Sequence, residues 1–251
     1  MAIVQDLAVN IVDMGFRYGD NSGVAFSKLN LQIPKGGRFG LFGPNGAGKT
    51  TLMNLMTGVL RVQEGHIMLL GYEAGKQHIE ANKLFGFVPQ DFSFYQELSP
   101  VENLEFFGGW SGLTKAQIKQ RTDELLQILG LEDVRDKQVQ KFSGGMKRRV
   151  NLAIGVIHQP QVLFLDEPTV GVDVQTRHAI IEYLKALNNS GTTLVYTSHQ
   201  LNEAEGLCDD VAMIDAGKII ARGSIDGLLA EHQQQDLEAL FINLTGKELR
   251  D

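Results

Sequence analysis

The chain has 251 residues, 43% of them apolar and 21% charged, and its formal net charge is −7. At roughly 150 residues per domain this length predicts one or two domains, and the acidic balance argues against a protein that mainly coats nucleic acid. A single cysteine, Cys208, excludes an intrachain disulfide and fits a reducing compartment. No run approaches the ~18 apolar residues of a membrane span, and no secretory leader is recognisable, so we expect a cytoplasmic protein.

The first third of the chain predicts strands and turns. Apolar and polar residues alternate over Ser27–Ile33, which is typical of a half-buried antiparallel strand. A short strand over Arg38–Phe42 leads into a glycine-rich loop, and a helix with apolar residues between Leu52 and Val59 follows it. A further strand is expected over His66–Leu70.

The middle third predicts helices. Ser99-Pro100-Val101-Glu102 is a capping box with proline at the first helical position, and Thr114-Lys115-Ala116-Gln117 is a second box. Gly130 ends the helix that the second box opens. Its expected apolar stripe consists of Ile118, Leu125, Leu126 and Leu129.

The last third alternates strands and helices, which predicts a parallel sheet covered by helices. Val162–Leu165 and Thr193–Thr197 are short apolar runs, as in strands buried on both faces. Val211–Arg222 predicts a hairpin, and the polar run Gln233–Gln235 predicts a linker. A short helix with Leu237, Leu240, Phe241 and Leu244 on one face is expected after it, docked on its own chain or on a partner.

The loop Gly43-Pro44-Asn45-Gly46-Ala47-Gly48-Lys49-Thr50 fits the phosphate-binding pattern G-x-x-x-x-G-K-S/T between a strand and a helix. Glycines let backbone N–H groups converge on phosphate oxygens, and the helix N-terminus adds its positive end. Lys49 would reach the outer phosphates and the Thr50 hydroxyl would bind Mg²⁺. A chance glycine turn is the alternative, which the strand–helix context disfavours. The expected nucleotide contacts here are Gly43, Asn45, Gly46, Ala47, Gly48, Lys49, Thr50 and Thr51.

Two carboxylates, Asp166 and Glu167, follow directly after the expected strand Val162–Leu165. Ligands of open α/β sheets bind at the carboxyl ends of strands. Asp166 would hold Mg²⁺ through water, and Glu167 would act as the general base that polarises the attacking water. By themselves the two acids would more often lie in a polar loop, but the phosphate loop favours the functional interpretation.

A second glycine-rich helix start lies in Phe142-Ser143-Gly144-Gly145-Met146-Lys147-Arg148-Arg149. Such a start can bind a second anion. A simple helix cap would explain Ser143 but not the paired glycines Gly144 and Gly145.

At these motifs the sequence resembles the nucleotide-binding subunits of ATP-binding cassette (ABC) transporters, over roughly Ile11 to Gly223. The resemblance implies that Tyr18 stacks on adenine and that Gln90 is the Q-loop glutamine near the metal. It further implies that Asp173, in Gly171-Val172-Asp173, belongs to the D-loop, and that His199 is a catalytic switch histidine. The metal residues would then be Thr50, Gln90 and Asp166.

The same resemblance implies an α/β fold: a P-loop NTPase core of mixed, largely parallel sheet with helices, an antiparallel β subdomain and an inserted helical subdomain. The expected ATPase domain covers residues 1–232, with the helical insertion at about 92–159. Residues 233–251 would form the linker and the short C-terminal helix.

Two residues depart from the family signature Leu-Ser-Gly-Gly-Gln. Phe142 replaces the leucine, and Met146 replaces the glutamine whose amide lies near the ribose across the dimer. The string Ser-Gly-Gly-Met-Lys-Arg-Arg and the ending Leu244–Asp251 look like the drug- and lipid-exporter branch that resembles daunorubicin exporters. Those exporters carry their membrane domain on a separate polypeptide.

The resemblance implies an ATP-hydrolysing subunit that powers export of a hydrophobic or amphipathic compound. ATP and Mg²⁺ would bind between two head-to-tail subunits, a second copy or a homologous ABC subunit, with Ser143, Gly144 and Gly145 acting across the dimer. The partners would include a separate multi-span membrane subunit and no nucleic acid, and the chain would lie peripherally on the cytoplasmic face of the membrane. Phe92, Phe94 and Tyr95 are either core residues or the edge of a pocket for a cytoplasmic helix of that subunit.

Two alternatives are a soluble ABC ATPase acting on a ribosome, nucleic acid or assembly factor, and a regulatory module that binds ATP without hydrolysis. The net acidity and the single cassette weigh against the first. Glu167 weighs against the second.

Overall fold

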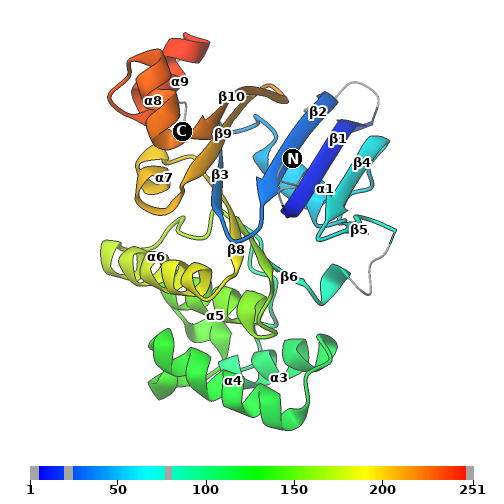
Figure 1. The fold of residues 1–251 in the computed structure, drawn as a ribbon. Helices are drawn as coiled ribbons and strands as arrows, with labels where there is room; N and C mark the ends of the chain where they lie inside the picture. Colours follow the sequence, from blue (N-terminus) through cyan, green and yellow to red (C-terminus); the bar gives the residue numbers. More distant parts are fainter. Residues whose placement is uncertain (1–5, 20–24, 77–80, 247–251) are drawn as a thin grey trace.

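The computed structural model describes residues 6–19, 25–76 and 81–246 (Figure 1). The end of the exporter-like C-terminal string, residues 247–251, lies outside the described residues. No helix within these ranges is both long enough and apolar enough to cross a bilayer.

An antiparallel sheet forms one part of the molecule. Its strands lie in the order β2-β1-β4-β5, with bounds Leu7–Arg17 (β1), Ala25–Pro34 (β2), Glu64–Leu69 (β4) and Tyr72–Glu73 (β5). Along β2 the apolar Leu29, Leu31 and Ile33 are buried and the polar residues between them are exposed. The alternation predicted for Ser27–Ile33 is therefore confirmed.

A six-stranded sheet forms the centre, in the order β10-β9-β3-β8-β7-β6. Strands β9, β3, β8, β7 and β6 run parallel, and β10 pairs antiparallel with β9 in the hairpin that the sequence predicts. This mixed, largely parallel sheet confirms the expected fold class. The bounds are Arg38–Phe42 (β3), Phe85–Val88 (β6), Val162–Asp166 (β7), Thr193–Ser198 (β8), Asp210–Asp215 (β9) and Lys218–Ser224 (β10).

Helices cover both faces of this sheet, and α3 and α4 lie at the opposite end of the molecule from α8 and α9 (Figure 1). Ser99 and Thr114 form the two predicted capping boxes, at the starts of α3 and α4. The helices are α1 (Lys49–Met56), α3 (Pro100–Trp110), α4 (Lys115–Ile128), α5 (Gly144–Val156), α6 (Val174–Asn189), α7 (Leu201–Leu207), α8 (Ile225–His232) and α9 (Leu237–Thr245), with short 3-10 turns at Glu132–Val134 and Val139–Lys141.

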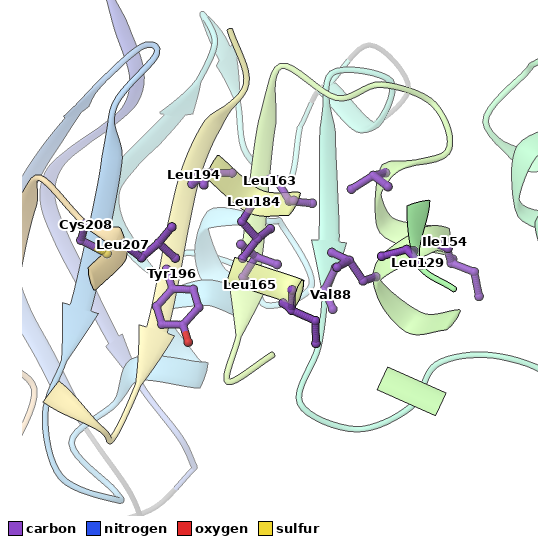
Figure 2. Packing of buried hydrophobic residues seen from close by; sticks show 14 of the residues in the cluster. Val88, Leu129, Ile154, Leu163, Leu165, Leu184, Leu194, Tyr196, Leu207 and Cys208 are labelled. Atoms are coloured by element: carbon purple, nitrogen blue, oxygen red, sulfur yellow. The ribbon is translucent and has the colours of Figure 1, made fainter. Parts of the chain in front are cut away.

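The central sheet is buried on both faces, which explains its continuous apolar strands. In β7, Leu163 and Leu165 belong to one buried cluster, while Val162 and Phe164 belong to the other. Figure 2 shows the first cluster, in which Leu163 and Leu165 lie close to Leu184 of α6. The second cluster joins the sheet to α1 and to the antiparallel sheet.

Helix α9 docks on its own chain. Leu237, Leu240 and Phe241 are buried in the larger apolar cluster, and the backbone N–H of Leu237 donates to Glu205 Oε1 of α7 at 2.8 Å. Of the two docking modes open at the sequence level, the structure selects this one.

The sequence patterns misplace one helix end and miss three strands and two helices. Helix α1 ends at Met56 rather than near Val59, because Gly58 has a left-handed φ of 74°, and Val59 is 66% exposed. Strands β1, β5 and β6 and helices α7 and α8 were not predicted. Strand β6 has only four residues, too few to show a period.

Candidate active site

The glycine-rich loop between β3 and α1 has a backbone that favours glycine at three positions. A Cβ on Gly43 would lie 2.1 Å from the Ile214 carbonyl oxygen. Gly46 and Gly48 have left-handed φ values of 79° and 111°. No described side chain caps the start of α1, so its first N–H groups remain available to an anion.

The Lys49 ammonium group is held inside this loop. Lys49 is 5% exposed, and its Nζ donates to the carbonyl oxygens of Gly43 at 2.8 Å and Pro44 at 3.2 Å. Burial lowers the pKa of Lys49, an effect that the carboxylates of Glu167 and Asp166 oppose. The cation is thus fixed where a phosphate would neutralise it.

The Glu167 carboxylate is the meeting point of the candidate catalytic groups. Its Oε2 lies 3.2 Å from His199 Nδ1 and accepts from Gln90 Nε2 at 3.4 Å, while Oε1 lies 3.9 Å from Lys49 Nζ. Glu167 is 6% exposed. The parallel strands β3, β8, β7 and β6 bring these groups to the carboxyl end of the sheet.

The backbone of Glu167 is held in an unusual conformation. Its φ of 50° is left-handed, a region that non-glycine residues seldom adopt. The Glu167 N–H donates to the carbonyl oxygen of Thr197 at 3.2 Å and to its hydroxyl at 3.1 Å. Strand β8 therefore supports the turn that aims the carboxylate at the cleft.

The Glu167 side chain borders a cleft of about 220 Å³. Beside this cleft, the Tyr18 hydroxyl lies 3.3 Å from Thr51 Oγ1, and the ring packs edge-on against Phe16. Tyr18 is 38% exposed, so its ring can accept a stacked base. The cleft is lined by Asn45, Gly46, Gly48, Lys49, Thr50, Thr51, Gln90 and Glu167.

The residues expected around Mg²⁺ offer only oxygen ligands, which suits that ion. Thr50 contributes a hydroxyl, Gln90 an amide oxygen and Asp166 a carboxylate. Asp166 is 1% exposed, and its Oδ1 accepts from Thr197 Oγ1 at 2.6 Å, which fixes its orientation at the end of β7.

Ser143, Gly144, Gly145 and Asp173 gather at a different place. Ser143 caps α5 and Asp173 caps α6. A Cβ on Gly145 would lie 3.6 Å from Asp173 Oδ2, so the two helix starts adjoin each other. Of the described residues that line the cleft beside Lys49, none belongs to this group. Within a single chain, therefore, only the glycine loop before α1 borders the cleft, and the glycine-rich start of α5 lies elsewhere.

Arg148 is a site residue to which the sequence assigned no role. It is 5% exposed, and its Nη1 donates to the Gln90 carbonyl oxygen at 2.7 Å, while its Nη2 donates to that of Val170 at 3.5 Å. Its guanidinium lies 4.9 Å from the Phe92 ring centroid. Arg148 thus ties α5 to the segments that carry Gln90 and Glu167. Its place in the Lys147-Arg148-Arg149 run hid it, because charge runs usually lie in solvent.

A glycine loop around a buried lysine, with carboxylates at the end of a neighbouring parallel strand, defines a P-loop nucleotide-binding protein. Comparison with known proteins gives the family. Residues 26–170 match the family model described as ABC transporter. The chain therefore belongs to the ABC transporter family.

Similar proteins agree with this assignment. The chain is 43% identical over 196 residues to the linearmycin resistance ATP-binding protein LnrL of Bacillus subtilis, a match that covers 78% of the chain and 63% of LnrL. It is 38% identical over 226 residues to the daunorubicin resistance ATP-binding protein DrrA3 of Streptomyces coeruleorubidus, covering 90% of the chain and 71% of DrrA3. A solved ATP-binding subunit of an ABC transporter superposes with a TM-score of 0.87 at 25% identity, covering 95% and 99% of the two chains.

Proposed function

We propose that the chain powers the export of a hydrophobic or amphipathic compound through a separate membrane subunit, by binding and hydrolysing ATP with Mg²⁺. The convergence of Lys49, Gln90 and His199 on the Glu167 carboxylate carries the hydrolytic part of the proposal. The similarity to LnrL and DrrA3, which are named for resistance to linearmycin and daunorubicin, supports the export part.

In the proposed reaction, the backbone N–H groups of the glycine loop and the Lys49 ammonium group hold the phosphates of ATP. Glu167 orients the attacking water and accepts its proton, and His199 contacts the γ-phosphate from the neighbouring strand end. Mg²⁺, near Thr50, Gln90 and Asp166, would offset the negative charge of the phosphates. Tyr18 stacks on the adenine.

The proposed assembly is a head-to-tail dimer. Since Ser143 and Gly145 lie away from the cleft, a second subunit is needed to bring a glycine-rich helix start onto the exposed side of the γ-phosphate. Two-fold symmetry gives two equivalent sites. ATP favours the closed dimer through its higher affinity for that state, and hydrolysis removes the preference.

The proposed contact with the membrane subunit is a groove of about 360 Å³ between β6, α3 and α5. Phe107, Trp110 and His158 are among its lining residues, and Trp110 is 81% exposed. Phe92 and Phe94 stack with ring centroids 5.3 Å apart, and Tyr95 is 48% exposed. We assign this aromatic surface to a cytoplasmic helix of the membrane subunit.

Vesicles that contain the chain and its membrane subunit test the function. ATP should drive accumulation of a labelled amphipathic drug inside inverted vesicles, and Glu167→Gln should abolish the accumulation. Trp110→Ser should weaken co-purification of the two subunits. Ile128→Ser, at another exposed apolar residue of the helical region, serves as its matched control. ATP hydrolysis unaffected by any membrane partner, with no drug uptake, would contradict the export role.

A further inference from the structure

A buried polar cluster behind the candidate active site is not used by the proposed reaction. Its centre is Glu203 of α7, whose side chain is 6% exposed. Its partners come from the turn after Glu167, from the end of β8 and from α6: Thr169, Tyr196, Ser198 and Arg177.

One oxygen of the Glu203 carboxylate accepts hydrogen bonds from three hydroxyl groups. Glu203 Oε2 accepts from Tyr196 at 2.6 Å, from Thr169 at 2.7 Å and from Ser198 at 3.3 Å. The other oxygen, Oε1, lies 3.2 Å from Arg177 Nε. A buried carboxylate is costly unless it is satisfied in this way, so the cluster holds its members together.

The Tyr196 hydroxyl is the proton donor in this arrangement. The ring is fully buried beside Leu207 of α7, with its hydroxyl pointing away from that apolar contact (Figure 2). Burial raises the pKa of Tyr196 well above its usual range, and the negative charge of Glu203 adds to the increase. The phenol therefore stays protonated, and its O–H donates a hydrogen bond to the carboxylate.

The partners of Glu203 are chain neighbours of the reactive groups. Thr169 lies in the turn that begins at Glu167 and is closed by the bond from Val170 N–H to the Glu167 carbonyl oxygen, 3.3 Å. Ser198 directly precedes His199. Glu203 thus accepts hydrogen bonds from the segment that carries Glu167 and from the segment that carries His199. The side chains of these two residues meet at the 3.2 Å contact between Glu167 Oε2 and His199 Nδ1.

We propose that Glu203 is a positioning residue for ATP hydrolysis: by binding Thr169 and Ser198 at once, it fixes the distance between Glu167 and His199. The proposal rests on the roles proposed above for these two residues. Glu203 itself touches neither the cleft nor the glycine loop, so its loss should affect the reaction more than ATP binding.

The test compares the full chain with Glu203→Ala, Glu203→Gln and the matched control Glu205→Ala. Glu205 lies on the same helix but binds the start of α9, so its variant reports the general cost of losing a carboxylate contact on α7. Steady-state hydrolysis gives kcat, titration with a fluorescent ATP analogue gives Kd, and thermal unfolding gives Tm.

For Glu203→Ala we expect kcat to fall at least about tenfold while Kd stays within about threefold. Glu203→Gln keeps an oxygen acceptor of the same reach and should recover most of kcat. Glu205→Ala should lower Tm and leave kcat unchanged. If Glu203→Ala does not fold, the double variant Thr169→Val and Tyr196→Phe removes two of the hydrogen bonds and should show the same loss of kcat.

An unchanged kcat in Glu203→Ala, or a loss of kcat equal to that of Glu205→Ala, would overturn the positioning role. Glu167→Gln separates this failure from failure of the proposed function. If Glu167→Gln still hydrolyses ATP, the catalytic assignment itself is wrong; if it does not, only the role of Glu203 falls.

Discussion

Glu167 and His199 reach one another from the ends of neighbouring parallel strands, with 3.2 Å between Oε2 and Nδ1. They are 32 residues apart in the chain, and the pairing of Asp166 with Thr197 sets the register of β7 and β8 and so brings the two residues level with each other. The contact places a candidate base beside a group that can sense the γ-phosphate. The predictions below start from this geometry.

Replacing Lys49 with alanine should weaken ATP binding. The buried ammonium group would make charge-assisted hydrogen bonds to phosphate, each worth about 1.5–3 kcal/mol, so the Kd for ATP should rise roughly 10- to 100-fold. Equilibrium titration measures the change, with Lys115→Ala on the exposed start of α4 as control. A Kd equal to that of the unmodified chain would remove Lys49 from the binding site.

Glu167→Gln should leave ATP binding within a few-fold and reduce turnover by roughly 10²- to 10⁴-fold, because an amide cannot act as a base. With ATP and Mg²⁺, this variant should accumulate as a dimer in gel filtration. Glu182→Gln, an exposed substitution on α6, should behave as the unmodified chain does. Full hydrolysis by Glu167→Gln would show that another group serves as the base.

Met146→Gln should change the Michaelis constant for ATP by less than about tenfold. The amide would add one ordinary hydrogen bond, worth about 0.5–1.5 kcal/mol, across the dimer. Met146 also packs at the edge of the larger apolar cluster of its own chain. Complete loss of activity would therefore mean that this packing, rather than the missing amide, is what the position requires.

Phe241→Ala should destabilise the chain by about 3–5 kcal/mol, since the ring is 1% exposed in the larger cluster. The adjacent Ile242 is 38% exposed, so Ile242→Ala should cost far less. Urea unfolding measures both.

Deleting residues 233–251 should lower stability or assembly but keep ATP affinity within a few-fold. Lost ATP binding in a folded truncated chain would mean that the tail supports the nucleotide site.

The stability of the chain should fall as the pH drops below about 6.5, partly through His158. Burial lowers the pKa of His158, although the bond of Nε2 with the Phe85 carbonyl oxygen at 2.9 Å opposes this. As the pH falls, the unfolded chain therefore binds a proton on His158 at a higher pH than the folded chain does. The free energy of unfolding decreases as the pH drops from the pKa of His158 in the unfolded chain to its pKa in the folded chain.

Urea unfolding at several pH values between 5 and 8 tests this linkage. His158→Gln should flatten the dependence, whereas His66→Gln, at an exposed position of β4, should keep it. Equal pH dependence in all three proteins would exclude a contribution from His158.

The sequence by itself determined the fold class and nominated the residues of the candidate site. Residues such as Lys49 and Glu167 stand in short local patterns, and the buried strands and capping boxes are local as well. The roles assigned to these residues stay predictions. Weak local signals also explain the errors, because the end of α1 at Met56 and the four-residue strand β6 show little periodicity to detect.

Only the tertiary structure decided which side chains meet. Arg148 and Glu203 bind groups that are more than 20 residues away or belong to other elements. Neither residue stands in a local sequence pattern that would distinguish it from a charged residue exposed to solvent. The docking of α9 likewise depends on an apolar surface assembled from distant segments. Sequence patterns report a residue's own element, whereas burial and pairing are set by how the strands are ordered in the sheet.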